Sequence, residues 1–336
     1  MPKNGIDLIK VLDLTYDNED INHPFTRQPS LYYDYEGIKK FLRKHRNKIT
    51  VLSLNIQSIN AKLNELTLFL CKLLNDGLLF DVITLQECWL TDEKDLTLLN
   101  IPNYTIFAQA NGVHLSTHCG LVTYVNNRLS ADIFLKYKTS TTWEGLFVDI
   151  SLSPKSKIAI GNIYKPPGTN IDEFRADFIN KITNIKRHNE QLVLAGDFNI
   201  DLLLASAPNK YQDFYDSVTN LYMLPTITFP TRFPEKSNEK NPSLIDQIYI
   251  KFSNCTNNYE SGIYYPRISD HKATFLALNV APDVEKCPKY VKIKTSNKAS
   301  LDRIKEELRT VNWTDIFNHD VDANPNETYE KVCDHN

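Results

Sequence analysis

The chain has 336 residues, of which 42% are hydrophobic and 24% are charged, and its formal net charge is −3. This composition is that of a globular protein with a substantial core, and it excludes a low-complexity or fibrous chain. The near-neutral total charge gives no support for nucleic-acid binding, so any DNA contact must rest on local charge. No apolar stretch approaches the roughly 20 residues of a membrane span, so we expect a soluble, intracellular monomer with no membrane partner.

The N-terminal residues 1–48 are polar and aromatic and end in a basic run from Lys39 to Lys48. We interpret this run as a solvated helix face rather than a phosphate-facing patch. Residues 1–48 are therefore predicted to be an N-terminal extension. A compact domain over residues 49–280 is expected to follow, and the polar, lysine-rich residues 281–336 are expected to form a connector.

Apolar periodicity predicts alternating strands and helices across residues 49–280. Strands are expected at 49–54, 80–85, 120–125, 146–150, 158–163, 192–195, 244–250 and 273–278. Amphipathic helices are expected over Leu63 to Leu73 and after Asn170, where Glu173 three residues later completes a capping pattern. Strands mixed with helices favour two sheets packed face to face with helices outside, but periodicity alone does not distinguish this arrangement from a doubly wound α/β fold.

The six cysteines are scattered along the chain without a Cys-x-x-Cys pair, at positions 71, 88, 119, 255, 287 and 333. Such spacing predicts reduced thiols rather than disulfides or zinc ligands.

Polar clusters stand where predicted strands end, which is where a scaffold presents functional groups. Asn55 ends the first strand, and Glu87 follows the second as the best single candidate for a Mg²⁺ ligand. Either residue alone is more commonly a solvated strand end. The run Gly196-Asp197-Phe198-Asn199 is more specific, because Asp197 could activate a water while Asn199 contacts a phosphate. The alternative for this run is an Asx turn.

A second specific cluster is Ser269-Asp270-His271, which precedes an apolar strand. Histidine can stabilise a pentavalent phosphate or transfer a proton near neutral pH. Asp246 lies inside an apolar strand, and a buried carboxylate requires a partner, for which His271 is the best candidate. Tyr164 and Thr228 are hydroxyls at strand ends that could reach a phosphate, although each would also pass for an ordinary sheet residue.

Taken together, these clusters supply every role that metal-assisted phosphodiester hydrolysis requires. The sequence contains no Gly-x-Ser-x-Gly elbow, Walker A loop or His-Glu-x-x-His helix. Other common hydrolase chemistries are therefore not indicated.

The same motifs, in the same order, resemble the endonuclease/exonuclease/phosphatase superfamily over about residues 49–280. Within it, the runs 53–58, 85–90 and 163–167 resemble the endonuclease of LINE-type, non-long-terminal-repeat retrotransposons. The resemblance implies a DNase I-like α/β fold, a four-layered sandwich of two packed mixed β-sheets flanked by helices. It also implies a nick in one strand of target DNA that leaves a 3′-hydroxyl to prime reverse transcription.

The resemblance further implies a role for each matched residue. Glu87 would bind Mg²⁺, which Mn²⁺ could replace, with help from Asn55 and Asp270. Asp197 would position or activate water, and Asp246 would orient His271, which would stabilise the transition state. The residues expected at the phosphate are Asn199, Tyr164, Thr228 and Ser269.

The tail of the chain also matches this family. The runs 311–315 and 326–329 resemble the connector that leads to a reverse transcriptase in these elements, and no polymerase signature follows. We therefore expect a fragment of an element that acts in the nucleus, with element RNA as a second partner through the missing polymerase region. Two alternatives remain: a phosphoesterase of the same fold acting on a small or lipid phosphoester, and an inactive retrotransposon relic.

Overall fold

The computed structural model describes residues 30–92, 96–110, 118–139, 142–153, 156–188, 191–205, 209–233, 241–251 and 259–279. The chain divides into two compact units, Met1–Val284 and Glu285–Asn336, and every described residue belongs to the first. The predicted connector over 281–336 therefore lies outside the described residues.

The first sheet has seven strands in the order β1-β12-β13-β2-β3-β5-β4. Their bounds are Leu31–Tyr33, Tyr259–Tyr264, Ala273–Leu278, Ile49–Asn55, Val82–Gln86, Leu121–Asn126 and Tyr104–Gln109, in that order. The pairs β1·β12 and β2·β3 are parallel and the other pairs are antiparallel, so the sheet is mixed.

The second sheet has six strands in the order β10-β11-β9-β8-β7-β6. Their bounds are Met223–Pro225, Asp246–Lys251, Leu192–Asp197, Ser156–Tyr164, Glu144–Ser153 and Ser130–Lys138. Only β8 and β9 run parallel in this sheet. The strand predicted at 244–250 begins at Asp246, because Leu244 and Ile245 instead bond the segment after β9: Leu244 N donates to Asp201 Oδ1 and Ile245 O accepts from Phe198 N.

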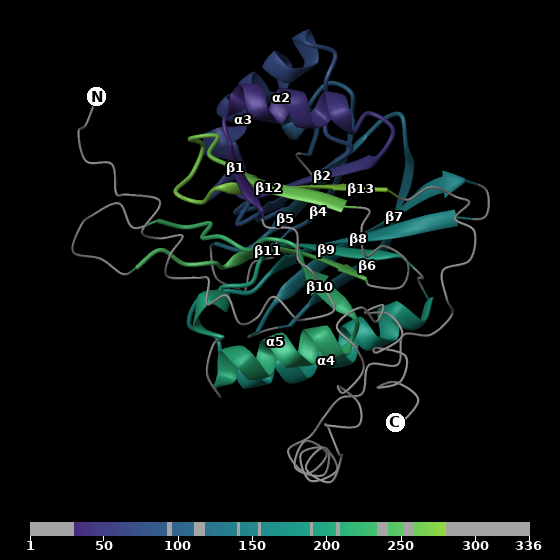
Figure 1. Cartoon of the computed structure of the whole chain (residues 1–336). Coiled ribbons are helices and arrows are strands. Elements are labelled where there is room, and N and C mark those ends of the chain that lie inside the picture. The colour runs from purple at the N-terminus through teal and green to yellow at the C-terminus, as the bar shows by residue number, and fades with distance from the viewer. Residues whose placement is uncertain are drawn as a thin grey trace, which may run out of the picture. The chain divides into compact units, whose positions relative to one another are not determined.

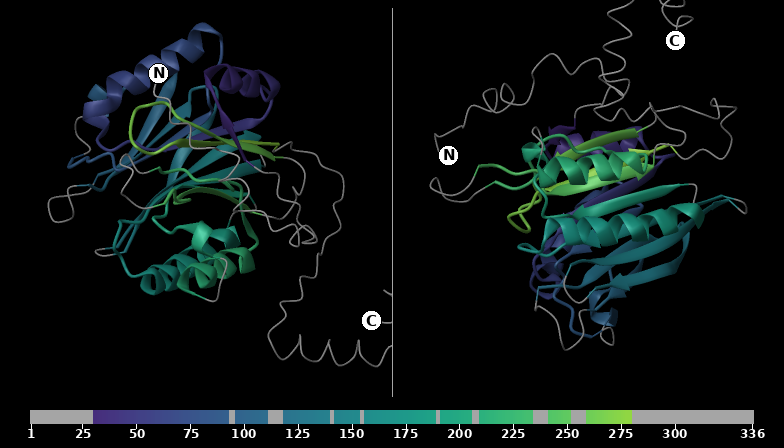
Figure 2. Two further views of the ribbon diagram at one scale, coloured as in Figure 1. Left: turned by 60° about the vertical axis from the view of Figure 1, so that its left-hand side comes forward. Right: turned by 90° about the horizontal axis from the view of Figure 1, so that it is seen from below.

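The two sheets face each other with two helices on each outer face (Figures 1 and 2). The helices α2 (Tyr35–Lys44) and α3 (Ile59–Asn75) cover the first sheet, and α4 (Ile171–His188) and α5 (Lys210–Asn220) cover the second. Aliphatic side chains of both sheets, such as Val51, Val148 and Ile248, form the core between them. The four-layered, DNase I-like sandwich is thus confirmed, and the doubly wound alternative is excluded.

Helix α4 illustrates how local sequence signals place an element. The Asn170 side chain accepts hydrogen bonds from the backbone N–H groups of Asp172 (2.8 Å) and Glu173 (3.3 Å), as the predicted cap requires. Phe174 and Phe178 then recur at helical spacing and are fully buried against the sheet. Cap and apolar stripe together fix where α4 begins and which face it presents.

The segment before residue 49 contributes a strand and a helix to the sandwich, both on the side of the first sheet. Strand β1 pairs with β12, and Ile38, Phe41 and Leu42 of α2 are buried in the core above the first sheet. Arg43 and Lys44, in the last turn of α2, keep side-chain exposures of 46% and 64%. The basic run therefore overlaps the amphipathic helix α2, which belongs to the sandwich.

Among the described residues, no helix is long and apolar enough to cross a membrane. Cys71, Cys88 and Cys119 are free thiols, as predicted. The other three cysteines lie outside the described residues.

Candidate active site

A row of polar residues crosses the end of the second sheet. The strand registers pair Asp246 with Asp197 and Asp197 with Tyr164, on β11, β9 and β8. Residues directly opposite on neighbouring strands project to the same face, with Cβ atoms about 5 Å apart. All three side chains therefore point into the space between the sheets, at one end of the core.

The first sheet adds Asn55, the last residue of β2, and Glu87, which follows β3. Asn55 Nδ2 donates to Glu87 Oε1 (2.9 Å) and to Asp197 Oδ2 (2.9 Å), so one amide bridges the two sheets. The Tyr164 hydroxyl donates to the same Glu87 oxygen at 3.0 Å. Four predicted residues are thereby joined in one hydrogen-bonded group.

Glu87 is held by backbone bonds on both sides. Glu87 O accepts from Ser58 N (2.8 Å), and the next residue, Cys88, donates its N–H to Gly120 O (2.9 Å). The φ angles of Glu87, Trp89 and Ser58 are +49°, +55° and +81°, in a region that costs a non-glycine residue about 1–3 kcal/mol. Such backbone outliers concentrate at functional sites, and the hydrogen bonds around Glu87 hold its strained backbone in place.

The Asp197 carboxylate is fully buried and accepts three hydrogen bonds, one from Asn55 and two from Asn199. Asn199 donates its backbone N–H to Asp197 Oδ1 (2.9 Å) and its Nδ2 to Asp197 Oδ2 (3.0 Å). Burial and the neighbouring Asp246 raise the pKa of Asp197 to about 7, against the lowering effect of His271 and these hydrogen bonds. A carboxylate with such a pKa can accept a proton near neutral pH.

His271 and Asp246 form the predicted pair, and both are buried. Nδ1 of His271 lies 2.9 and 3.0 Å from the two carboxylate oxygens of Asp246. Thr231 completes the group by donating its hydroxyl to Asp246 Oδ2 (2.6 Å). Burial by itself lowers the pKa of His271, but the charge and hydrogen bond of Asp246 outweigh it and raise the pKa to about 9. The imidazole is therefore cationic at neutral pH.

Ser269 and Asp270 approach the same place from the loop before β13. The Ser269 hydroxyl donates to Asn55 O (2.6 Å) and accepts from His271 N (3.3 Å), which fixes this loop to the end of β2. Asp270 Oδ2 accepts from Arg232 Nε and Nη2 at 3.1 and 2.9 Å. Its other oxygen, Oδ1, lies 3.9 Å from His271 Nε2.

One predicted residue is bonded elsewhere. The Thr228 hydroxyl accepts from Ser30 N (3.0 Å) and shares a hydrogen bond with Ser30 Oγ (3.0 Å), and no hydrogen bond among the described residues ties it to the other candidates. The threonine that contacts the site is Thr231, and Arg232 was likewise not anticipated. Nothing in the sequence marks Thr231 over Thr228, since both follow an apolar residue or proline in the same short segment.

The site has acceptor atoms suited to a hard divalent cation. Among the described residues, Asn55 Oδ1 and Asp270 Oδ1 are buried acceptors without a hydrogen-bond partner, and the carboxylate of partly exposed Glu87 accepts from the Asn55 amide. Oxygen donors of this kind are the ones Mg²⁺ prefers. Asp197, Asp246 and His271 form a second group, with one possible ligand atom each within 4.8 Å of one another. His271 Nδ1 is already paired with Asp246, so the first group fits a cation better.

Two of three comparisons with known proteins found matches, and these agree on the fold. The sequence model of the Endonuclease/Exonuclease/phosphatase family matches residues 36–271. No curated protein matches the sequence significantly.

The chain is similar in structure to the endonuclease domain of TRAS1, a telomere-specific non-LTR retrotransposon, with TM-score 0.51 and 14% identity over 69% of this chain and 98% of that one. It is also similar to the AP endonuclease LMAP from Leishmania major, with TM-score 0.57 and 13% identity over 80% and 97%. A third similar structure is the 3′ phosphatase NExo from Neisseria bound to product DNA hairpin, with TM-score 0.51 and 15% identity over 69% and 99%.

Proposed function

The chain belongs to the endonuclease/exonuclease/phosphatase family, and we propose that this phosphoesterase is a Mg²⁺-dependent endonuclease that nicks one strand of DNA. The nick would leave a 3′-hydroxyl that primes reverse transcription, as in non-LTR retrotransposons. Members of this family generally use a divalent metal, and acidic residues suited to one are present here. Target DNA in the nucleus, and element RNA as a second partner, follow from the same proposal.

The observation that carries the proposal is the meeting of three kinds of group at one end of the sandwich. These are the buried base candidate Asp197, the buried cation His271, and two acceptor oxygens without partners on Asn55 and Asp270. A buried polar atom without a partner costs free energy, so such atoms signal a ligand that satisfies them. Phosphodiester hydrolysis requires a base, a positive charge and cation ligands.

Asp197 would act as the general base. The Asn55 and Asn199 amides hold its carboxylate in place, and its pKa of about 7 lets it take a proton from water near neutral pH. These hydrogen bonds restrain the rotation of the carboxylate, so the proton-accepting atom would be oriented in advance.

His271 would stabilise the negative charge that develops on the phosphoryl oxygens. Because Nδ1 is bonded to Asp246, the Nε2–H is the group that can donate to the phosphate. Thr231 and Asp246 act on substrate only through this ring, so they are positioning residues.

Glu87, with Asn55 and Asp270, would hold Mg²⁺ or Mn²⁺, whose charge would offset that of the phosphate. The Tyr164 hydroxyl already donates to Glu87, and the Asn199 amide already donates to Asp197 and to Lys165 O. They would contact phosphate by exchanging one of these hydrogen bonds. Ser269 would support the loop that carries Asp270 and His271.

Support for DNA as the substrate comes from the retrotransposon-like motifs and from the similarity to an endonuclease domain and an AP endonuclease. The similarity to a 3′ phosphatase favours a second candidate, the removal of a terminal phosphate. The two reactions differ in whether an intact strand is cut.

Incubation with supercoiled plasmid and Mg²⁺ tests the proposal. We expect open circles that a DNA polymerase extends directly, because the nick carries a 3′-hydroxyl. Activity on 3′-phosphorylated oligonucleotides without plasmid nicking would replace the endonuclease with the second candidate. DNA binding without any turnover would indicate an inactive relic.

A further inference from the structure

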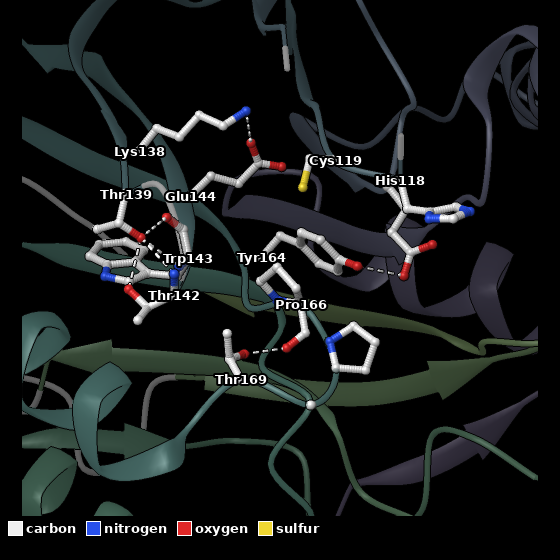
Figure 3. Close-up of a pocket in the computed structure, with 13 residues that line it drawn as sticks. His118, Cys119, Lys138, Thr139, Thr142, Trp143, Glu144, Tyr164, Pro166 and Thr169 are labelled. Atoms are coloured by element: carbon white, nitrogen blue, oxygen red, sulfur yellow. Dashed lines mark hydrogen bonds and ion pairs between the residues drawn. The ribbon is translucent and has the colours of Figure 1, made fainter. Parts of the chain in front are cut away.

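A pocket of about 480 Å³ opens directly beside the candidate active site. Its lining comes from residues 87, 118–119, 138–139, 142–144, 164 and 166–169, and we call it the Lys138 pocket. Figure 3 shows Lys138, Thr139 and Trp143 on one side of this pocket and His118 on the other, with Tyr164 between them. The Tyr164 hydroxyl donates to Glu87. The volume lies within the range of about 300–1,000 Å³ typical of small-molecule sites.

The pocket continues the polar row of the second sheet by one strand. The register pairs Tyr164 of β8 with Glu144 of β7, so the row runs Asp246, Asp197, Tyr164, Glu144. Asp197 and Asp246 belong to the proposed reaction centre, and Glu144 lies at the far end in the Lys138 pocket. A substrate whose phosphodiester lies at Asp197 would therefore extend past Tyr164 into this pocket.

The charges of the Lys138 pocket indicate which part of a substrate it accepts. Lys138 is the one lysine or arginine among the lining residues, and its Nζ lies 3.3 Å from Glu144 Oε2. Glu144 is buried and also accepts from Gly120 N (2.7 Å). Glu87 adds a second carboxylate, whose charge the proposed cation would offset. Lys138 is already paired with Glu144, so an anionic ligand such as a clustered phosphate would find no further lysine or arginine among the lining residues, whereas a neutral ligand needs none.

The remaining lining suits the neutral part of a nucleotide. Pro166 and Pro167 supply apolar surface. Thr139 and Thr142 also line the pocket, and their hydroxyls bond each other at 2.8 Å. The Pro166 loop is fixed to the site, because Lys165 N donates to Asp197 O (3.0 Å) and Asn199 Nδ2 donates to Lys165 O (2.9 Å). A ligand against this loop would thus lie at a set distance from Asp197.

We propose that the Lys138 pocket binds the sugar and base of the nucleotide next to the phosphodiester that is cut. This inference rests on the proposed phosphodiesterase function and specifies its substrate on one side. A substrate must then carry a nucleoside on the side of the reacting phosphate that faces the Lys138 pocket. Inositol phosphates and other multiply charged substrates are disfavoured.

The test compares small chromogenic phosphodiesters that differ in the nucleoside alone. These are bis(p-nitrophenyl) phosphate and the p-nitrophenyl esters of thymidine 5′-phosphate and thymidine 3′-phosphate. For the wild-type enzyme with Mg²⁺, we expect one thymidine isomer to have a KM at least about ten-fold lower than the nucleoside-free ester, since one base contact is commonly worth that much. Equal KM values for all three esters would overturn the inference.

Two variants locate the effect. Pro167→Trp places a large ring at the exposed mouth of the pocket, and Ala176→Trp places the same ring on the exposed face of α4, away from the lining. Pro167→Trp should lose the ten-fold preference and still hydrolyse the nucleoside-free ester, which reports that it is folded. Ala176→Trp should keep the preference. A preference that survives in both variants would place the nucleoside elsewhere.

The failure of this inference is distinct from that of the proposed function. If the enzyme hydrolyses none of the esters and does not nick plasmid, the proposed function falls. If it nicks plasmid and treats the three esters alike, the Lys138 pocket alone loses its assignment.

Discussion

The Asp246 side of the site and the Glu87 side use their hydrogen-bonding capacity differently. Asp246, His271 and Thr231 are buried and bond one another, so both Asp246 carboxylate oxygens and His271 Nδ1 are satisfied within the protein. Glu87 is partly exposed and stands on strained backbone, and its proposed co-ligands Asn55 and Asp270 carry acceptor oxygens without partners among the described residues.

This difference indicates what each side contributes. A closed, hydrogen-bonded pair holds a charge and a ring orientation ready for reaction, and requires no ligand. Acceptors without partners call for a cation or water. The Asp246 side is therefore expected to set the pH dependence, and the Glu87 side is expected to set the metal dependence. Asp197 joins the two sides through Asn55 and through its register with Asp246.

Removing the shared base should have the largest effect. Asp197→Asn is expected to lower kcat by about 10²–10⁴-fold, because an amide cannot accept the proton from water. The measurement is the rate of plasmid nicking at saturating Mg²⁺. Asp201→Asn is the matched control, since the Asp201 carboxylate accepts, among the described residues, from the backbone N–H groups of Leu203 and Leu244 alone, and an amide oxygen can do the same. Equal rates for the two variants would remove Asp197 from the reaction.

The pH profile of the nicking rate tests the roles of Asp197 and His271. The rate should rise through about pH 7 as Asp197 loses its proton and fall through about pH 9 as His271 loses its proton. A histidine with a raised pKa is charged below that pKa, so its contribution is present at neutral pH and is lost on the alkaline side. In Asp246→Asn, the fall should move to lower pH. An unchanged alkaline limb in this variant would separate His271 from Asp246.

The metal titration tests the Glu87 side. Glu87→Gln should raise the Mg²⁺ concentration for half-maximal nicking by at least about 10–100-fold, since a carboxylate is lost from the cation site. Asp246→Asn serves as the comparison and should leave this concentration nearly unchanged. The opposite result, with the larger shift in Asp246→Asn, would assign the cation to Asp197, Asp246 and His271 instead.

A substitution at Gly196 tests how far the fold depends on the close backbone contact between β9 and β8. A Cβ at Gly196 would lie 1.9 Å from Ile163 O, so an alanine must push β8 away from β9. Gly196→Ala should cost about 3 kcal/mol of unfolding free energy, at the upper end for overpacking. Gly77→Ala has a positive φ but no atom within 4 Å, and it should cost about 1–2 kcal/mol in a denaturant titration. Equal losses would mean that the strands tolerate the shift.

The smallest expected effect distinguishes two threonines. Thr231→Val removes a hydrogen bond from buried Asp246 and should lower kcat by about ten-fold, the equivalent of roughly 1.4 kcal/mol. Thr228→Val removes a contact with Ser30 and should leave kcat nearly unchanged. A larger loss in Thr228→Val would restore Thr228 to the phosphate site, as the sequence suggested.

The sequence identified the strands with continuous apolar runs and the residues at their ends. Strands such as β2, β3 and β13 are buried on both faces, and short apolar runs of this length are typical of such strands. By contrast, β6 is mostly exposed, and α5 is polar and aromatic, so neither has a clear apolar pattern. Strand β1 is only three residues long, and its partner strand β12 lies more than 200 residues further along the chain.

The site was more predictable in its members than in its contacts. Asn55, Glu87, Asp197 and His271 stand in short motifs, whereas Thr231 and Arg232 reach the site only because β11 and the loop before β13 bring Asp246 and Asp270 to them. The partnerless oxygens of Asn55 and Asp270 are likewise visible only once the chain is folded. Which hydroxyl meets which carboxylate depends on register, which no local motif records.

Nicking of supercoiled plasmid by the wild type and by Asp197→Asn, first with Mg²⁺ and then with excess EDTA, tests the central claim most directly. The account predicts open circles from the wild type with Mg²⁺ alone, and none above background from the variant or with EDTA. Nicking by wild-type protein that persists in EDTA, or that Asp197→Asn carries out at the wild-type rate, would contradict a metal-dependent reaction at this site.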